Sequence, residues 1–158
     1  MSVSLWRIAT DTPRWKADDL SGTGAMATGG RWNRKGIPVV YSSANRALAC
    51  LETQVHLDAG SLPFNRYLVE IVVPDAVWAA AQVETTGSLP IGWDAEPAGL
   101  ESLNFGTNWL IQGSSCLLII PSAIVAEECN VLINPAHASA AQISATKIRR
   151  WLYDPRLL

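Results

Sequence analysis

The stretch GGRWNRKGIPVVYSSANRALACLETQVH, residues 29–56, decides the fold, and the rest of the chain is arranged around this stretch. A glycine pair and Arg31 precede a short apolar run that ends at Tyr41, and a segment with helical spacing follows and carries one acid, Glu52. Polar side chains set among apolar neighbours in this way predict a ligand pocket that is floored by a strand and walled by a helix. We expect Arg31, Tyr41 and Glu52 to point into that pocket.

The second half of this stretch has the spacing of an amphipathic helix. Apolar side chains recur at intervals of four, three and four residues between Ala44 and Val55. Ser42 or Ser43 is a suitable N-cap for such a helix. At about 100° per residue, Glu52 falls roughly 70° from the middle of the apolar stripe. We therefore expect its carboxylate at the edge of the buried face, where an unpaired charge is costly.

Several segments have the composition of strands. Within the opening stretch, residues 37–41 are rich in β-formers, and the period of two places Val39 and Tyr41 on one face. Other strand-like segments are residues 3–8, 66–73, 115–120, 130–133 and 147–153, and residues 100–112 have helical character. About six strands and a few helices without regular alternation predict an α+β fold. The length favours a single domain over residues 1–158.

Composition excludes some classes of function. The net charge of -2 and the pI near 5.6 argue against a domain that grips nucleic acid through its phosphates. Charged residues make up only 16 % of the chain, which suggests that a partner or a second copy, as in a homodimer, covers part of the surface. The first residues lack the pattern of a signal peptide, and no apolar run reaches the ~18 residues of a membrane span. We expect a cytoplasmic protein.

Cysteine and histidine do not indicate a metal site. Cys50, Cys116 and Cys129 are odd in number and lack a CxxC spacing, so reduced thiols are expected. His56 and His137 have no ligand-spaced partners nearby. The sequence therefore predicts neither a disulfide framework nor a bound metal.

Residues 22–27, GTGAMA, match the loose GxGxxA form of a dinucleotide fingerprint. In that fingerprint the glycines act between a hydrophobic strand and a helix. Neither element is evident around these residues, so a Rossmann site is not predicted.

Polar residues of the opening stretch are candidates for chemistry, and each has a structural alternative. Arg31 offers a planar donor fork for phosphate or carboxylate, or forms an ordinary surface salt bridge. Tyr41 offers a flat face for a ring and a hydroxyl for a sugar or phosphate, or is a core aromatic. Glu52 is a functional carboxylate or one half of an ion pair, but Arg46 lies about 120° around the helix and does not face it. His56 either contacts Glu52 or faces solvent.

Ser122 follows the apolar run at 115–120, at a strand end from which side chains often project into a cleft. Its hydroxyl is suited to a phosphate or a ribose. A catalytic triad is not predicted, because no histidine–acid pair is evident to activate the serine.

Separated segments carry a family resemblance in a consistent order. They are GGRWNRKGIPVVYSS, ALACLETQVHL, NWL at 108–110, PSAIV at 121–125, NVLINPAH at 130–137 and YDPRL at 153–157. Together they resemble the RES-domain toxins of bacterial toxin–antitoxin pairs. The arginine, glutamate and serine that give this family its name correspond to Arg31, Glu52 and Ser122, although Ser42 and Ser43 also lie near the expected pocket.

The resemblance implies a single compact domain with a mixed sheet similar to ADP-ribosyltransferases. It implies that NAD is consumed as a substrate and that no cofactor is held. Members of the family cleave the bond between nicotinamide and ribose, with water or phosphate as the acceptor. It also implies a cognate antitoxin of the Xre type, a helix-turn-helix protein that covers the pocket and makes the DNA contacts.

These implications assign roles to the candidate residues. Glu52, Arg31 and Tyr41 are expected to be catalytic, with Arg31 holding a diphosphate or an acceptor phosphate and Tyr41 packing on the nicotinamide ribose. Ser122 and Ser42 are expected to contact the substrate. Two alternatives remain open: transfer of ADP-ribose to a protein, and a non-enzymatic interaction module in which Arg31 and Glu52 form a structural pair.

Overall fold

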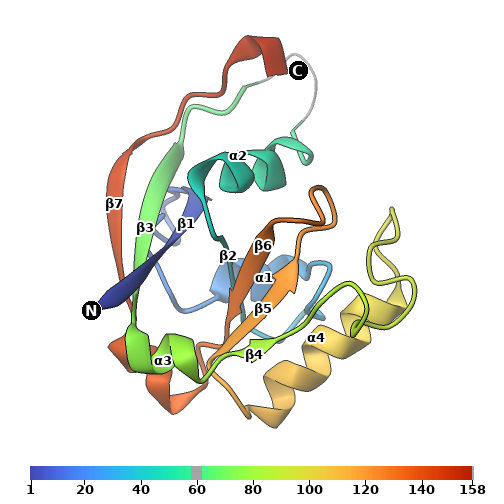
Figure 1. Cartoon of the computed structure of the whole chain (residues 1–158). Coiled ribbons are helices and arrows are strands. Elements are labelled where there is room, and N and C mark those ends of the chain that lie inside the picture. Colours follow the sequence, from blue (N-terminus) through green and yellow to red (C-terminus); the bar gives the residue numbers. More distant parts are fainter. Residues whose placement is uncertain (58–61, 158) are drawn as a thin grey trace.

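One seven-stranded sheet organises the computed structural model, which describes residues 1–57 and 62–157 (Figure 1). The strands are β1 (Ser2–Thr10), β2 (Val40–Ser43), β3 (Arg66–Pro74), β4 (Gln82–Val83), β5 (Leu117–Pro121), β6 (Cys129–Ile133) and β7 (Ser144–Arg150). Their order across the sheet is β4-β5-β6-β2-β1-β3-β7. The β4–β5 pair is parallel and the other neighbours are antiparallel, so the sheet is mixed.

The helices do not alternate regularly with the strands, and all but one of the strand pairs are antiparallel, which confirms the predicted α+β class. They are α1 (Thr23–Thr28), α2 (Arg46–Gln54), α3 (Asp75–Ala79) and α4 (Leu100–Gln112), with the short 3-10 helices η1 (Ala138–Gln142) and η2 (Pro155–Leu157). In Figure 1, α2 and α4 are well separated, one beside β1 and β2 and the other beside β5. No helix in the described part of the chain has the length and apolar character of a membrane span.

The core explains why a space opens between these two helices. The alternation along β5 sends Leu117 and Ile119 into one cluster, which covers one face of the sheet, and Leu118 and Ile120 into another. On this second face, α4 covers β5 and β6 through a cluster that includes Trp109. A separate cluster joins α2 to β1. Because two clusters rather than one cover this face, the surface of the sheet between them is left open.

The helix that carries Glu52 differs from its prediction at both ends. Its N-cap is Asn45, whose side chain accepts a hydrogen bond from the Leu48 backbone N–H at 2.8 Å, and not Ser42 or Ser43. Both serines extend β2 instead. The helix ends at Gln54, so Val55 lies beyond it and is 59 % exposed. The predicted helix was therefore too long by one residue at this end.

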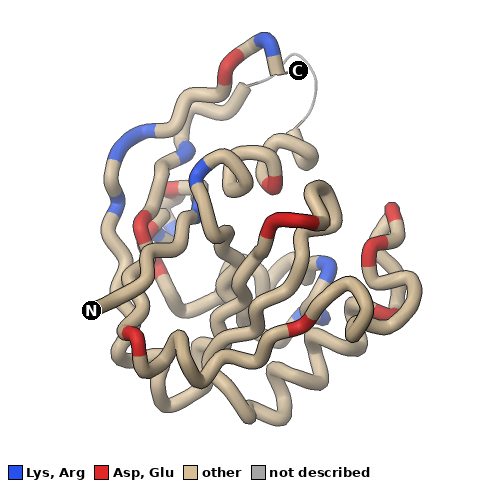
Figure 2. The backbone as a smooth tube through the Cα atoms, viewed as in Figure 1, with Lys and Arg blue, Asp and Glu red and all other residues tan. Residues whose placement is uncertain are grey.

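The last strand also lies earlier than expected. β7 ends at Arg150, and the residues after it leave the sheet and pack against α2, where the Tyr153 and Thr53 hydroxyls are 2.6 Å apart. The basic residues of β7 follow an edge of the sheet, whereas acidic residues gather on the β4–α4 connection and on the β5–β6 hairpin (Figure 2). The alanine-rich segment at 76–83, whose composition predicts no particular element, contributes to α3 and β4.

The cysteines are free thiols, as predicted. Cys50 and Cys116 are buried, and burial raises the pKa of both thiols. Within residues 1–57 and 62–157, no group of three or more histidine, cysteine or acidic side chains is placed to hold a metal ion.

Candidate active site

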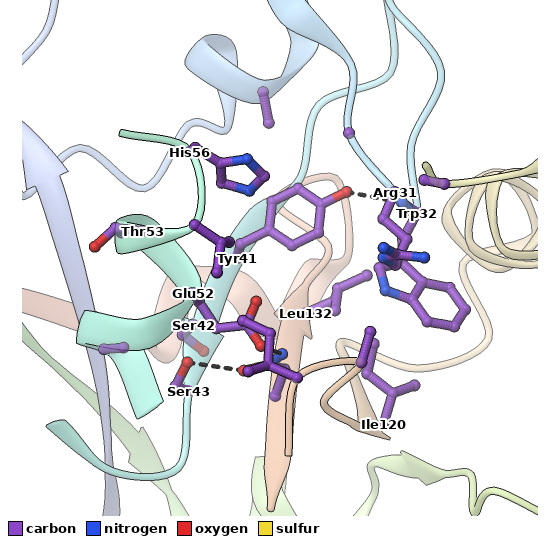
Figure 3. Close-up of a pocket in the computed structure, with 18 of the residues that line it drawn as sticks. Arg31, Trp32, Tyr41, Ser42, Ser43, Glu52, Thr53, His56, Ile120 and Leu132 are labelled. Carbon is purple, nitrogen blue, oxygen red and sulfur yellow. Dashed lines mark hydrogen bonds between the residues drawn. The ribbon is translucent and has the colours of Figure 1, made fainter. Parts of the chain in front are cut away.

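A cavity of about 1020 Å³ lies on the open face of the sheet, between α2 and the segments that precede β2 and α4. Its wall includes Tyr41 and Glu52 and, from the facing cluster, Trp32 and Ile120 (Figure 3). Sites for small molecules in proteins are typically about 300–1,000 Å³, so this cavity has room for a ligand as large as a dinucleotide. The expected pocket, floored by a strand and walled by a helix, is present.

Glu52 is held in place from one side. Its Oε1 accepts a hydrogen bond from Ser122 Oγ at 2.6 Å and another from Asn130 Nδ2 at 2.6 Å. Among the described residues, both hydrogen bonds to the carboxylate fall on Oε1, and the carboxylate forms no ion pair. Neutral donors fix the orientation of a carboxylate without cancelling its charge. Oε2 consequently has no hydrogen-bond partner among the described residues and can accept a hydrogen bond from a ligand.

Ser122 holds the Glu52 carboxylate from the side that faces away from the cavity. Ser122 is 0 % exposed, and its hydroxyl also accepts hydrogen bonds from the backbone N–H groups of Ile124 and Val125 at 3.0 and 3.2 Å. The hydroxyl is therefore fully engaged and lies beneath the cavity wall. We expected Ser122 to contact the substrate, but the turn after β5 directs its side chain toward α2 and away from the cavity. Ser122 is a positioning residue for Glu52.

Asn130, which sequence reasoning missed, completes this support. It lies in β6 opposite Ser43 of β2, and its Oδ1 accepts a hydrogen bond from Ser43 Oγ at 2.8 Å. In the sequence, Asn130 could have been noticed as the polar residue that begins the apolar run NVLI. Only the pairing of β6 with β2 shows that Asn130 lies close enough to contact Glu52. Ser42, which lines the cavity and is 5 % exposed, donates its hydroxyl to the Val131 carbonyl at 2.7 Å.

Tyr41 presents its ring to the cavity while its hydroxyl is held by the loop before β2. The hydroxyl donates to Asn33 Oδ1 at 2.6 Å and accepts from the Trp32 backbone N–H at 3.1 Å. Burial raises the pKa of Tyr41 above its ordinary value, so the phenol stays neutral at physiological pH. Gly30 is required here, since a Cβ at that position would lie 2.8 Å from Tyr41 Oη. The hydroxyl is thus committed to the fold, and the ring is what faces a ligand.

Arg31 lines the cavity but is already bound to the β4–α4 connection. Its Nη1 donates to the carbonyls of Trp93 and Ala95 at 3.1 and 2.8 Å, and its Nη2 pairs with the Glu96 carboxylate at 3.0 Å. The salt-bridge alternative raised by the sequence is therefore present. Arg31 and Glu52 do not pair with each other, so the structural pair on which the non-enzymatic alternative depended is not formed.

The candidates come together from different elements, as Figure 3 shows. Glu52 belongs to α2 and His56 to the residues after it, whereas Arg31 and Trp32 belong to the loop before β2, with Tyr41 drawn between the two groups. His56 is exposed and lines the cavity. The residues singled out in the sequence that line this cavity are Arg31, Tyr41, Ser42, Ser43, Glu52 and His56, whereas Ser122 is buried and is not part of the lining.

An anchored carboxylate and an aromatic ring line a cavity of nucleotide size over a mixed sheet, which gives this α+β domain a candidate ligand-binding site. Residues 4–154 match the model of the RES domain. The chain belongs to the RES-domain family, which confirms the resemblance seen in the sequence.

Relatives and a solved structure agree with this assignment. The chain is 60 % identical over 158 residues to the "Prs ADP-ribosylating toxin" of a Sphingobium species, covering 100 % of this chain and 98 % of that protein. It is 35 % identical over 156 residues to a "Toxin Res" of Yersinia enterocolitica, covering 98 % and 99 % of the two chains. The crystal structure of the MbcT–MbcA toxin–antitoxin complex of M. tuberculosis contains a chain of the same fold, with a TM-score of 0.68 and 16 % identity, covering 99 % of this chain and 87 % of that one.

Proposed function

We propose that this protein is a toxin that uses NAD as a substrate, cleaves the bond between nicotinamide and ribose, and transfers the ADP-ribose to a protein. The observation that carries the proposal is the geometry of Glu52: a carboxylate with one oxygen anchored by two neutral donors and the other facing a cavity. Such an arrangement supplies fixed negative charge where positive charge develops in a reaction.

The chemistry of NAD matches that arrangement. The C1′–N bond breaks with its electron pair going to the pyridinium nitrogen, so nicotinamide leaves neutral and the ribose becomes an oxocarbenium-like cation. The leaving group needs no proton, in contrast to the two-carboxylate mechanism of ordinary glycosidases. Glu52 would stabilise the cation directly or through the ribose 2′-hydroxyl. The nucleophilic atom of the acceptor then bonds to C1′ and loses its proton.

The neighbouring residues would position the substrate. The ring of Tyr41 would pack on the nicotinamide ribose, since its hydroxyl is committed to the loop before β2. Arg31 would hold the β4–α4 connection at the rim of the cavity and supply positive charge there. Ser122 and Asn130 would keep Glu52 from turning away from the ligand.

The acceptor distinguishes transfer to a protein from NAD hydrolysis or phosphorolysis. The name of the relative at 60 % identity describes ADP-ribosylation of a protein called Prs, and that relative aligns over the full length of this chain. This supports a protein acceptor. Water and phosphate, the acceptors that the family resemblance implies, would use the same bond cleavage and deplete NAD directly.

We also propose a protein antitoxin as the partner. The solved structure that shares this fold comes from a toxin–antitoxin complex. An antitoxin that covers the cavity would silence the enzyme by excluding NAD, and one of the Xre type would bring its own helix-turn-helix for DNA. Coexpression that restores growth, followed by copurification of the two proteins, tests this pairing.

Product analysis tests the proposed reaction. The purified chain is incubated with NAD labelled in the adenine, with the Prs protein of the same cell, and with or without inorganic phosphate. Label bound to Prs supports the proposal, and label found only in free ADP-ribose or its phosphate ester contradicts a protein acceptor. Glu52→Gln is the inactive control, and Glu127→Gln, which changes an exposed acid on the β5–β6 hairpin, is the matched active one.

A further inference from the structure

Residues 151–157, the C-terminal segment, run from the end of β7 back to α2 (Figure 1). The Trp151 backbone N–H donates to the carbonyl of the first residue of β3 at 2.9 Å, which fixes the start of the segment. The Tyr153 ring is buried in the cluster that joins α2 to β1, and its hydroxyl lies 2.6 Å from that of Thr53. Thr53 directly follows Glu52 in the last turn of α2. The segment therefore contacts the helix beside the candidate catalytic carboxylate.

The hydrogen bond between these two hydroxyls has one direction. Thr53 Oγ1 donates its single proton to the Cys50 carbonyl at 3.0 Å, within the helix. It therefore accepts from Tyr153, and the phenol is the donor. Burial raises the pKa of Tyr153, so this proton stays on the phenol at physiological pH. One chain of hydrogen bonds thus joins Tyr153 to the backbone of α2.

The last turn of α2 needs a contact from outside the helix, because its other parts are better held. Asn45 caps the N-terminus through its side chain, and residues 48–50 are buried. The residue after the helix is Val55, which is exposed and is not a glycine that would close the last turn. The C-terminal segment supplies the bond from its tyrosine and a second one, from the Gln54 side-chain amide to the Leu157 carbonyl.

Glu52 is consequently held from two sides of α2. Ser122 and Asn130 donate to its Oε1, each at 2.6 Å, from the side of β5 and β6. At about 100° per residue, the Thr53 side chain leaves the helix in a different direction. In Figure 3 the Thr53 hydroxyl points away from the Glu52 carboxylate. The bond from Tyr153 opposes rotation of the last turn about the helix axis, a motion that the two bonds to Oε1 can follow through the flexible glutamate side chain.

We propose that Tyr153 is a positioning residue for Glu52: through Thr53, its hydroxyl fixes the last turn of α2 and with it the place of the carboxylate relative to the ribose of NAD. This proposal rests on the proposed function, because it assigns a role in nicotinamide release. A displacement of about 1 Å at a reacting group can cost about a hundredfold in rate, so a contact one residue from Glu52 affects catalysis without touching the substrate. It also gives a role to YDPRL at 153–157, a segment that carries the family resemblance.

The ring and the hydroxyl of Tyr153 can be tested separately. The ring packs with Ala49 and Cys50, whereas Thr53 is the partner of the hydroxyl among the described residues. Tyr153→Phe therefore keeps the packing and removes the hydrogen bond. Thr53→Val removes the same bond from the other side, and Thr53→Ser keeps it. Tyr67→Phe is the matched control, because Tyr67 is half-buried on β3 and packs against a different cluster.

Steady-state kinetics with NAD give the first measurement. Loss of one neutral hydrogen bond should lower kcat for nicotinamide release by about 2- to 10-fold in Tyr153→Phe, with KM unchanged. Thr53→Val should show the same fall and serves if Tyr153→Phe does not fold, whereas Thr53→Ser should keep most of the wild-type kcat and Tyr67→Phe all of it. In a Glu52→Gln background, Tyr153→Phe should have no further effect. Circular dichroism establishes that each variant is folded at the assay temperature.

The side-chain amide of Asn130 reports the place of Glu52 without any turnover. Its Nδ2 donates to Glu52 Oε1, so the resonances of its protons depend on where the carboxylate lies. In a two-dimensional proton–nitrogen NMR spectrum, Glu52→Gln identifies this signal among the side-chain amides. Tyr153→Phe and Thr53→Val should shift the signal, and Tyr67→Phe should leave it in place. An equal fall of kcat in Tyr67→Phe, or an additive loss in the Glu52→Gln background, would overturn the proposal.

The remaining outcomes separate this inference from the proposed function. If the wild type releases no nicotinamide but Tyr153→Phe shifts the Asn130 amide signal, the positioning contact stands and the proposed reaction fails. If nicotinamide is released and Tyr153→Phe changes neither kcat nor that signal, the reaction stands and the positioning role fails. If Thr53→Val raises only KM, Thr53 binds the substrate itself, and the positioning role is wrong.

Discussion

Replacing Ser122 with alanine tests whether the support beneath Glu52 is needed for catalysis. The variant loses the 2.6 Å hydrogen bond to Oε1, while the bond from Asn130 remains. A hydrogen bond to a charged group contributes about 1.5–3 kcal/mol, and each 1.36 kcal/mol in the barrier is about tenfold in rate. We therefore expect kcat for nicotinamide release to fall by about 10- to 100-fold, with a smaller change in KM.

The same substitution also destabilises the fold, and the two effects must be separated. Two backbone N–H groups lose their acceptor, which costs about 1–3 kcal/mol in unfolding free energy. Ser115→Ala is the matched control, because this buried serine bonds Trp109 and the Leu117 carbonyl and not Glu52. It should lower the denaturation midpoint without lowering kcat. A Ser122→Ala variant with wild-type kcat at a temperature where it is folded would refute the positioning role.

A double-mutant cycle sharpens this prediction. If Ser122 acts through Glu52, its removal should have almost no further effect on activity in a Glu52→Gln background, because the anchored charge is already absent. Additive losses of kcat in the double variant would show that Ser122 acts on the substrate by itself.

Other predictions follow from individual contacts. Arg31→Ala should raise KM for NAD by about tenfold or more, and a change in kcat alone would contradict the positioning role of Arg31. Glu96→Gln keeps the arginine but weakens its exposed ion pair, so it should have little effect on the unfolding free energy. Gly30→Ala should destabilise the loop by about 1–3 kcal/mol, because its Cβ would displace the Tyr41 hydroxyl, and a wild-type urea midpoint would contradict this. Burial raises the pKa of Tyr41 and of Tyr153, so the contribution of these two tyrosines to the unfolding free energy should be constant below about pH 10, where unfolded tyrosine titrates, and should fall as the pH rises further. Tyr41→Phe should make the fall of the unfolding free energy above that pH shallower in urea titrations at each pH.

The sequence predicted the elements with strong periodic patterns and the residues that line the cavity. β3 and β5 were found because their apolar runs are long, α4 was found because residues 100–112 have helical character, and Glu52 was placed correctly at the edge of a buried helix face. Short elements were less accessible, since the alanine-rich segment of α3 has no clear period. The N-cap was misassigned because serine and asparagine are both good caps, and only the pairing of β2 with β6 shows that the serines belong to the sheet.

The hydrogen-bond partners within the site could not be read from the sequence. Asn130 contacts Glu52 because of the register in which β6 pairs with β2. Arg31 contacts Glu96, which lies in the β4–α4 connection, where no regular structure indicates its position. These contacts join residues far apart in the chain, and sequence spacing has no information about them.

Nicotinamide release by Glu52→Gln tests the central claim most directly. Two unit charges about 4 Å apart interact by about 4 kcal/mol at an effective dielectric constant near 20, so removal of the carboxylate charge should slow bond cleavage by about 1,000-fold. The substitution keeps the size of the side chain, and the folded state is verified by circular dichroism. A folded Glu52→Gln protein that releases nicotinamide from NAD at the wild-type rate would contradict the account.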